Sequence, residues 1–418
     1  MISKDKLNTI LQYLLTFFII LDSRSVFSHF VDENLGKIFN ISIIFISLLI
    51  FFLNYNYRIK KRGVIFLGFY VIYIMLFFFI NVTDYQVSFL NTFLLLFPLL
   101  FLMFCVYSKK DVENLFKVYV NIMIVIASAS LIFFCLGSLT NIIQTNVTKV
   151  IDWGKNTTIN GYFYLHFNTQ TTVMFSQTLL RNTSIFVEGP MFALHLMFAM
   201  SLSLFFRKKI INKYSIIFGI SILSTLSVTG LLFYLFLLFY KYTFFNNGKI
   251  KIIILPIAFL IILTIGTTFF YDKQGSNSYN IRNDDYTAGF SAFKDNPTFG
   301  SGYLNNNGVV KYMSDYRMYN TGLSNSFIIV LVQGGIYLII FYLAPLLLGL
   351  KNLICAKEKN LFLIEILILQ LYLMFTSAYQ YTSLMISFLA FDYYLLMFYR
   401  KNNDVKEIFL EDETKYEI

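Results

Sequence analysis

The sequence has few charged residues. Asp, Glu, Lys and Arg together make up 13% of its 418 residues, whereas a soluble domain carries about a quarter. Hydrophobic residues make up 57% of the chain, and the mean hydropathy is +0.66. This composition excludes an ordinary soluble domain and indicates an integral membrane protein.

Cysteine is scarce as well. Cys105, Cys135 and Cys355 lie in or beside apolar segments and show no paired spacing, so we expect neither a disulfide framework nor a cysteine-based metal site. The chain has no internal repeat and no low-complexity segment. Its formal net charge of +10 would suit a nucleic-acid partner. The basic residues, however, form short clusters between apolar runs, which is typical of the cytoplasmic face of a membrane protein. We therefore expect no nucleic-acid partner.

The apolar segments predict an all-α polytopic membrane protein of about twelve transmembrane helices, with residues 1–418 forming a single integral membrane domain. The predicted spans are 7–21, 38–56, 64–81, 88–107, 115–139, 189–206, 214–228, 230–246, 251–271, 325–350, 360–378 and 381–399. With the N-terminus placed inside, 23 Lys and Arg residues fall on the inner side and 10 on the outer side. The positive-inside rule then predicts that both termini are cytoplasmic, with 400–418 as a cytoplasmic tail.

Two predicted outer segments are much longer than the others. Loop one covers 141–187 and loop two covers 272–324. Loops of this length in a compact fold are usually functional or disordered. Because both are rich in Tyr, Phe, Asn and Gly, we expect packed lids. Aromatic rings and amides suit carbohydrate binding, but an ordinary aromatic belt at the membrane interface would have the same composition.

The first candidate site lies at the end of loop one. We expect a short interfacial helix over 171–181 that brings Arg181 to the membrane edge. Glu188, Gly189 and Pro190 then open an apolar helix, whose unpaired backbone donors favour an anion. Arg181 is the side chain best shaped for phosphate oxygens. Glu188 would lie beside a reacting hydroxyl; the alternative is an Arg181–Glu188 salt bridge that only pins the loop. His195 lies two turns further on the same helix face and is either part of the site or a core residue.

Loop two carries the second set of candidates. Tyr286, Phe290 and Phe293 recur at helical spacing and predict a surface helix with Arg282 near its start. The set of candidate substrate contacts that follows is Asn296, Gly300, Gly302, Arg317 and Asn325. Asn296 precedes a proline and ends the helix, and the two glycines allow a tight turn with exposed backbone donors. Arg317 also fits a solvated loop charge, and Asn325 also fits a helix cap.

These residues resemble a known family. The step from Arg181 through Phe186-x-Glu188-Gly189-Pro190 into a helix resembles the Wzy-type polymerases of O-antigen and capsular polysaccharide. The run from Arg282 through Asn296-Pro297-x-x-Gly300-x-Gly302 resembles the same polymerases and the related O-antigen ligases. The ligases usually carry a His beside the Asn that closes the second loop, where this chain has Ser324.

The resemblance implies a glycosyltransferase of the bacterial plasma membrane. Such enzymes move a glycan chain from undecaprenyl diphosphate to a sugar hydroxyl of the next lipid-linked repeat unit. They need no cofactor, and their partners are a chain-length regulator and a flippase. Arg181 and Arg282 would hold the diphosphate, and Glu188 would be the base if burial raises its pKa. Neither loop has a carboxylate cluster typical of a metal site, although Asp284-Asp285 keeps such a site open. The same features would also suit an O-antigen ligase or, from a different class, a lipid-linked oligosaccharide flippase.

Overall fold

The computed structural model describes residues 3–28, 33–55, 61–152, 156–174, 176–207, 212–245, 277–317, 320–355 and 361–398, together with a few positions between 260 and 274. The longer helices are α1 (Lys4–Asp22), α2 (Glu33–Asn54), α3 (Lys61–Asn81), α5 (Phe97–Val106), α6 (Lys109–Phe133), α7 (Gly189–Phe206), α8 (Lys213–Ser224), α9 (Val228–Phe245), α11 (Asn277–Asp295), α13 (Ser326–Ile354), α14 (Leu361–Thr376) and α15 (Ser383–Phe398). The short ones are α4 (Gln86–Phe89), α12 (Asn307–Val310), the 3₁₀ turn η4 (Asp315–Arg317), and the π-helical segments η2 (Leu90–Leu96) and η3 (Phe134–Leu139).

The described chain is mainly helical, as predicted, and a helix occupies each predicted span that the structure describes. Six helices in this part of the chain are long and apolar enough to cross a membrane. They are Asn34–Asn54, Lys61–Asn81, Gln86–Val106, Lys109–Leu139, Gly189–Phe206 and Ser326–Ile354. The predicted span 251–271 lies almost entirely outside the described residues, as does the tail 400–418. The total of twelve spans therefore stays a prediction.

Loop one is not helical, so the all-α prediction is wrong there. It contains an antiparallel sheet of β1 (Val147–Asp152), β2 (Asn156–Tyr162) and β3 (His166–Asn168), and a hairpin of β4 (Thr171–Met174) and β5 (Gln177–Leu180). The hairpin, with Thr171 paired to Leu180, occupies the predicted helix over 171–181. Thr171, Thr172 and Val173 are β-branched, and such residues favour a strand over a helix.

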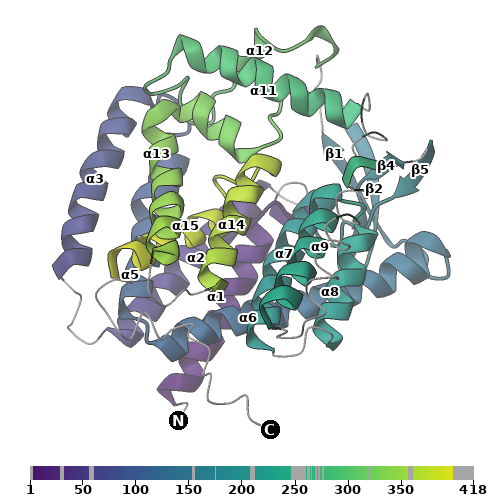
Figure 1. The fold of residues 1–418 in the computed structure, drawn as a ribbon, viewed down its shortest axis with the longest axis horizontal. Helices are drawn as coiled ribbons and strands as arrows, with labels where there is room; N and C mark the ends of the chain where they lie inside the picture. The colour runs from purple at the N-terminus through teal and green to yellow at the C-terminus, as the bar shows by residue number, and fades with distance from the viewer. Residues whose placement is uncertain are drawn as a thin grey trace.

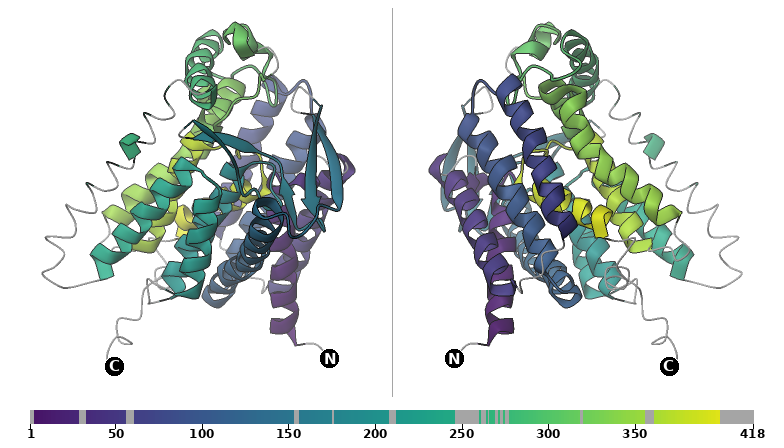
Figure 2. Two further views of the ribbon diagram at one scale, coloured as in Figure 1. Left: turned by 90° about the vertical axis from the view of Figure 1, so that its right-hand side faces the viewer. Right: turned by 90° about the vertical axis from the view of Figure 1, so that its left-hand side faces the viewer.

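The two loops lie at one end of the helical bundle. In Figure 1, α11 and α12 lie across the end opposite the start of α1, and the strands lie beside the upper ends of α7 and α8. Figure 2 shows the strands above the upper end of α1. A single β-bridge joins Ser25 to Phe186. The backbone N–H of Val26 donates to the Ile185 carbonyl at 2.8 Å, and that of Val187 donates to the Arg24 carbonyl at 3.1 Å. This bridge fixes the residues after α1 beside the start of α7.

Helix α13 is broken at Gly334-Gly335, and loop two forms hydrogen bonds with the backbone groups that the break leaves unpaired. Gly335 has φ +58°, outside the helical region. The backbone N–H groups of Ile336 and Tyr337, left without intrahelical partners, donate to the carbonyls of Pro297 and Thr298 at 2.8 and 3.0 Å. A broken helix at membrane depth is tolerated where other protein groups satisfy its backbone. Loop two is therefore built into the bundle rather than laid over it.

Candidate functional site

Arg181 lies at the start of α7 and is 7% exposed. Its Nε donates to the Thr225 carbonyl at 2.8 Å, and Nη1 donates to the Gln170 side-chain oxygen at 3.1 Å. The other terminal nitrogen, Nη2, has no hydrogen-bond partner within the described part of the chain. Arg181 is thus held in place by loop one and by the turn after α8, and it keeps donors for a further acceptor.

Gly189 was predicted to help open a helix start that binds an anion, but in the structure it makes room for the Arg181 side chain. Its φ is not among the positive values that require glycine. A Cβ atom at this position would instead lie 2.7 Å from Nε of Arg181 and 3.0 Å from Nη2, which is too close for real contacts. The absence of a side chain therefore allows the guanidinium to lie against the backbone at the helix start.

The first backbone donors of α7 are not free, which corrects the predicted anion site at this helix start. The N–H of Gly189 donates to the side-chain oxygen of Gln170 at 3.3 Å. The N–H groups of Met191 and Phe192 donate to the Glu188 carbonyl at 3.1 and 3.2 Å. An anion at this position would therefore be bound by side chains, because these backbone N–H groups already have partners.

Glu188 pairs with an arginine that we did not predict. Its Oε1 lies 3.5 Å from Nη2 of Arg24, while Nη1 of Arg24 donates to the Ala378 carbonyl at 3.1 Å. The predicted alternative of an Arg181–Glu188 salt bridge is not present at bonding distance among the described residues, although the two charges interact. The Glu188 side chain is 32% exposed. The side chain is therefore only partly buried, whereas the predicted base role called for burial, and its contact with Arg24 favours a bracing role.

Arg282, from loop two, is close enough to Arg181 for the two charges to interact. It lies in the second turn of α11, and its charge acts directly on Arg181. Burial lowers the pKa of Arg181 to about 10; the attraction of Glu188 opposes this fall, and the weaker repulsion from Arg282 adds to it. Arg282 also interacts electrostatically with Tyr286 and Tyr372. It has no hydrogen bond or ion pair with any residue that the structure describes.

Charge interactions therefore link Arg24, Arg181, Arg282 and Glu188. The Glu188 carboxylate pairs with Arg24 and attracts Arg181, and Arg282 repels Arg181. Formal charges leave this arginine cluster with an excess of two positive charges. Two guanidinium groups that repel each other at a partly buried position are unfavourable unless an anion joins them. The two arginines predicted to act together, one from each loop, thus interact by charge, and Arg24, which follows the first span, is an addition to them.

The predicted glycine turn of loop two contacts the protein itself. Gly300 and Gly302 have φ values of +70° and +111°, as a tight turn requires. However, the N–H groups of Ser301 and Gly302 donate to the carbonyls of Val332 and Gln333 at 2.8 and 3.1 Å. They cap the first half of the broken helix α13. The expected exposed donors are therefore already used, and Asn296, whose carbonyl accepts from Gly300 N–H at 2.9 Å, belongs to the same turn.

Arg317 is not the solvated charge that its loop position suggested. Its side chain is 1% exposed and lies 3.2 Å from Asp284 and 2.7 Å from Asp285. It also donates to the carbonyls of Asn320 and Gly322 at 2.7 and 2.9 Å. Asp284 and Asp285, which kept a metal site open, are thus both paired with one arginine. They lie on the buried face of α11, whereas Phe290 of the predicted apolar stripe is 44% exposed.

Asn325 and His195 have structural partners. Asn325 caps α13 by accepting from Ile328 N–H at 2.9 Å, as its second interpretation predicted. His195 is completely buried and stacks on Phe186 at 4.5 Å between ring centres. The hydroxyl of Tyr119 lies 2.9 Å from its Nδ1. A ring enclosed in this way is a core group and does not line the arginine cluster.

Arg24 was missed because no local pattern identifies it. It follows the first span, where a basic residue is ordinarily interfacial. Its place beside Glu188 depends on the bridge between Ser25 and Phe186, a contact between segments far apart in the sequence. Arg24 itself has φ +56°, which is uncommon for a residue other than glycine.

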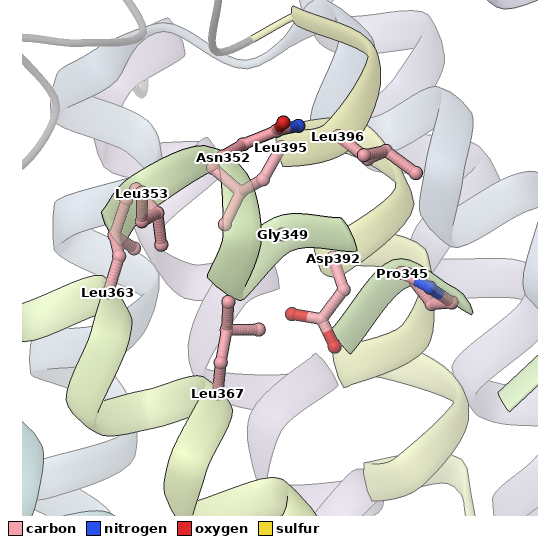
Figure 3. Close-up of a pocket in the computed structure, with 9 residues that line it drawn as sticks. All are labelled: Pro345, Gly349, Asn352, Leu353, Leu363, Leu367, Asp392, Leu395 and Leu396. Carbon is pink, nitrogen blue, oxygen red and sulfur yellow. The ribbon is translucent and has the colours of Figure 1, made fainter. Parts of the chain in front are cut away.

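A pocket elsewhere in the bundle contains none of these arginines. It lies between α13, α14 and α15 and is lined mainly by leucines and by Pro345, Gly349, Asn352 and Asp392 (Figure 3). Asp392 is 1% exposed and accepts from the Gln370 side chain at 3.2 Å. The pocket and the arginine cluster are separate features.

A buried polar network joins loop one to the helices. His166 lies within hydrogen-bond reach of Ser130 at 3.3 Å and of Asn168 at 3.3 Å. Asn182 accepts from Ser130 at 2.5 Å and donates to Ser224 at 2.9 Å. Because Asn182 adjoins Arg181, this network sets where the arginine lies.

The network predicts that loop one loosens in acid. Burial lowers the pKa of His166 to about 4, whereas a detached loop has the ordinary value of about 6.5. Between these values only the detached form takes up the proton, so stability is lost as the pH falls; at pH 5 the loss is about 2 kcal/mol. Thermal unfolding followed by the fluorescence of Trp153, the single tryptophan, should show this loss at pH 5 relative to pH 8. His166→Gln should remove the pH difference; an equal difference in that variant would contradict the assignment.

Comparison with known proteins gives no family for the chain: no family model, curated protein or solved structure matches it.

Proposed function

We propose that the chain is a polysaccharide polymerase of the bacterial plasma membrane, which transfers a growing glycan from undecaprenyl diphosphate to the next lipid-linked repeat unit. The observation that carries this proposal is the charge interaction between Arg181 of loop one and Arg282 of loop two, with unused donors on both. A guanidinium group can bind two phosphate oxygens at once, through two parallel hydrogen bonds. A diphosphate supplies the negative charge that the arginine cluster lacks.

In the proposed reaction, the bond between the anomeric carbon and the diphosphate oxygen breaks, and the acceptor hydroxyl oxygen bonds to that carbon. Negative charge develops on the departing diphosphate. Arg181 and Arg282, already in place, stabilise that charge without rearrangement. The hydroxyl proton leaves to Glu188 or to the diphosphate itself. Glu188 also holds Arg24 at 3.5 Å, so Glu188→Gln should retain more activity than Glu188→Ala if bracing is its main role.

The proposal extends to orientation and partners. With both termini cytoplasmic, the loops lie on the outer face, where a flipped lipid-linked unit presents its diphosphate. The partners would then be a flippase that supplies the units and a regulator of chain length. Capsule and O-antigen both fit this arrangement.

A deletion strain tests the proposal against its rivals. We expect it to display single repeat units on the cell surface and to lose long chains. Accumulation of long polymer on the carrier lipid would instead identify a ligase, and retention of lipid-linked units inside the cell would identify a flippase. Glycan length on gels, with complementation by the wild-type chain, gives the readout.

A further inference from the structure

The turn between β2 and β3 presents a group of exposed apolar side chains. Phe163, Tyr164 and Leu165 are 57%, 44% and 50% exposed. They form the whole three-residue connection between Tyr162 and His166, which pair across the hairpin. A turn on a water-exposed sheet normally carries Gly, Asn or Asp. Three consecutive large apolar residues at this turn indicate that it is not surrounded by water alone.

The backbone makes this choice of residues more unusual. Phe163 and Tyr164 have φ values of +49° and +58°, a region that glycine or asparagine adopts with less strain. Bulky aromatic residues therefore stand where smaller ones would fit the turn better. Their exposed side chains point to a stabilising contact beyond those within the described chain.

The turn packs against the outer part of a membrane span. Phe133 of α6 stacks on Tyr162 with 5.9 Å between ring centres and lies 6.0 Å from the ring of Phe163. Gly137 makes this approach possible, since a Cβ there would lie 2.6 Å from the Tyr162 ring. The hairpin end is thus fixed to the apolar run Lys109–Leu139, one of the six helices able to cross a membrane among the residues that the structure describes.

The depth of this contact can be judged along the helix. Phe133 lies six residues, more than one helical turn, before Leu139, where the apolar run ends. Ile132, Leu136 and Leu139 on the same stretch are 53%, 40% and 59% exposed, as expected of side chains that face lipid. The turn contacts this stretch through Phe133, which is next in sequence to the exposed Ile132.

We propose that the β2–β3 turn is a membrane anchor that inserts Phe163, Tyr164 and Leu165 among the lipids of the outer leaflet. Aromatic and aliphatic side chains at the boundary between headgroups and acyl chains suit this position. The anchor fixes the sheet of loop one relative to the membrane surface. It depends on the membrane assignment of α6 and not on the proposed polymerase activity.

Tryptophan fluorescence tests the anchor in the full-length protein. In a Trp153→Phe background, which leaves no other tryptophan, Phe163→Trp places a reporter in the turn. Gln177→Trp places a matched reporter on the exposed start of β5. Both proteins are reconstituted into phosphatidylcholine vesicles with and without lipids that carry a doxyl quencher near the headgroup.

We expect the residue 163 reporter to emit at shorter wavelength, to lose much of its emission to the doxyl lipids, and to be protected from iodide. The residue 177 reporter should show the reverse. Quenching of both reporters by iodide alone would overturn the proposal. Short-wavelength emission without doxyl quenching would also overturn it, because it would identify a protein contact. Leu165→Trp provides the same readout if Phe163→Trp does not fold.

Discussion

Replacing Arg181 or Arg282 with alanine is expected to abolish polymer synthesis, and lysine at either position is expected to restore little of it. Removal of one preorganised donor from a site of developing negative charge typically costs about a hundredfold or more in rate. Lysine keeps the charge but lacks the fork with which Arg181 contacts Thr225 and Gln170 while leaving Nη2 free. Glycan length in a complemented deletion strain, at matched membrane abundance, measures the effect.

A charge-preserving variant sharpens this prediction. Gly189→Ala retains all three arginines, but its Cβ would displace the Arg181 guanidinium from its position. We expect a large loss of polymer with little loss of folded protein. Lys294→Ala, which removes an exposed charge at the end of the helix that carries Arg282, should be active. Full activity of Gly189→Ala or of either arginine variant would remove that residue from the site.

Gly300→Ala is expected to be among the most destabilising single substitutions in the chain. Gly300 has φ +70°, and a Cβ there would lie 2.5 Å from the Val332 carbonyl oxygen. The backbone conformation alone costs about 1–2 kcal/mol. The overlap would also separate the turn from the broken helix, leaving backbone groups of α13 unsatisfied at about 1–3 kcal/mol each.

The melting temperature of the purified protein in detergent measures this effect. Gly68→Ala is the matched control, because nothing lies within 4 Å of a Cβ at that position. We expect the melting temperature to fall markedly in Gly300→Ala and not to fall in Gly68→Ala. Equal melting temperatures in the two variants would contradict the role assigned to the loop two turn.

The features that follow from local sequence were predicted well. Apolar runs located the described helices, and Gly189-Pro190 located the start of α7, because burial in lipid and the limits on proline act on neighbouring residues. The hairpin over 171–181 was not predicted. Its residues are apolar enough for an interfacial helix, and their β-branched character decided the outcome.

The functions of individual polar residues were predicted less well, because distant segments decide them. Arg317 looks solvated until Asp284 and Asp285 are placed beside it. The donors after Gly300 look free until the broken α13 is placed against them. Arg24 is unremarkable until the bridge after α1 brings it to Glu188. In each case a contact that spans the chain supplies the partner.

The arginine cluster is expected to bind the diphosphate of a lipid-linked substrate, and the whole proposed function depends on this binding. Titration of farnesyl diphosphate, a short-chain probe, into the protein in lipid nanodiscs tests it most directly, with farnesyl monophosphate as the comparison. We expect saturable binding that favours the diphosphate and is lost in the Arg181→Ala, Arg282→Ala double variant. Undiminished binding to the double variant, or equal binding of the two lipids, would contradict it.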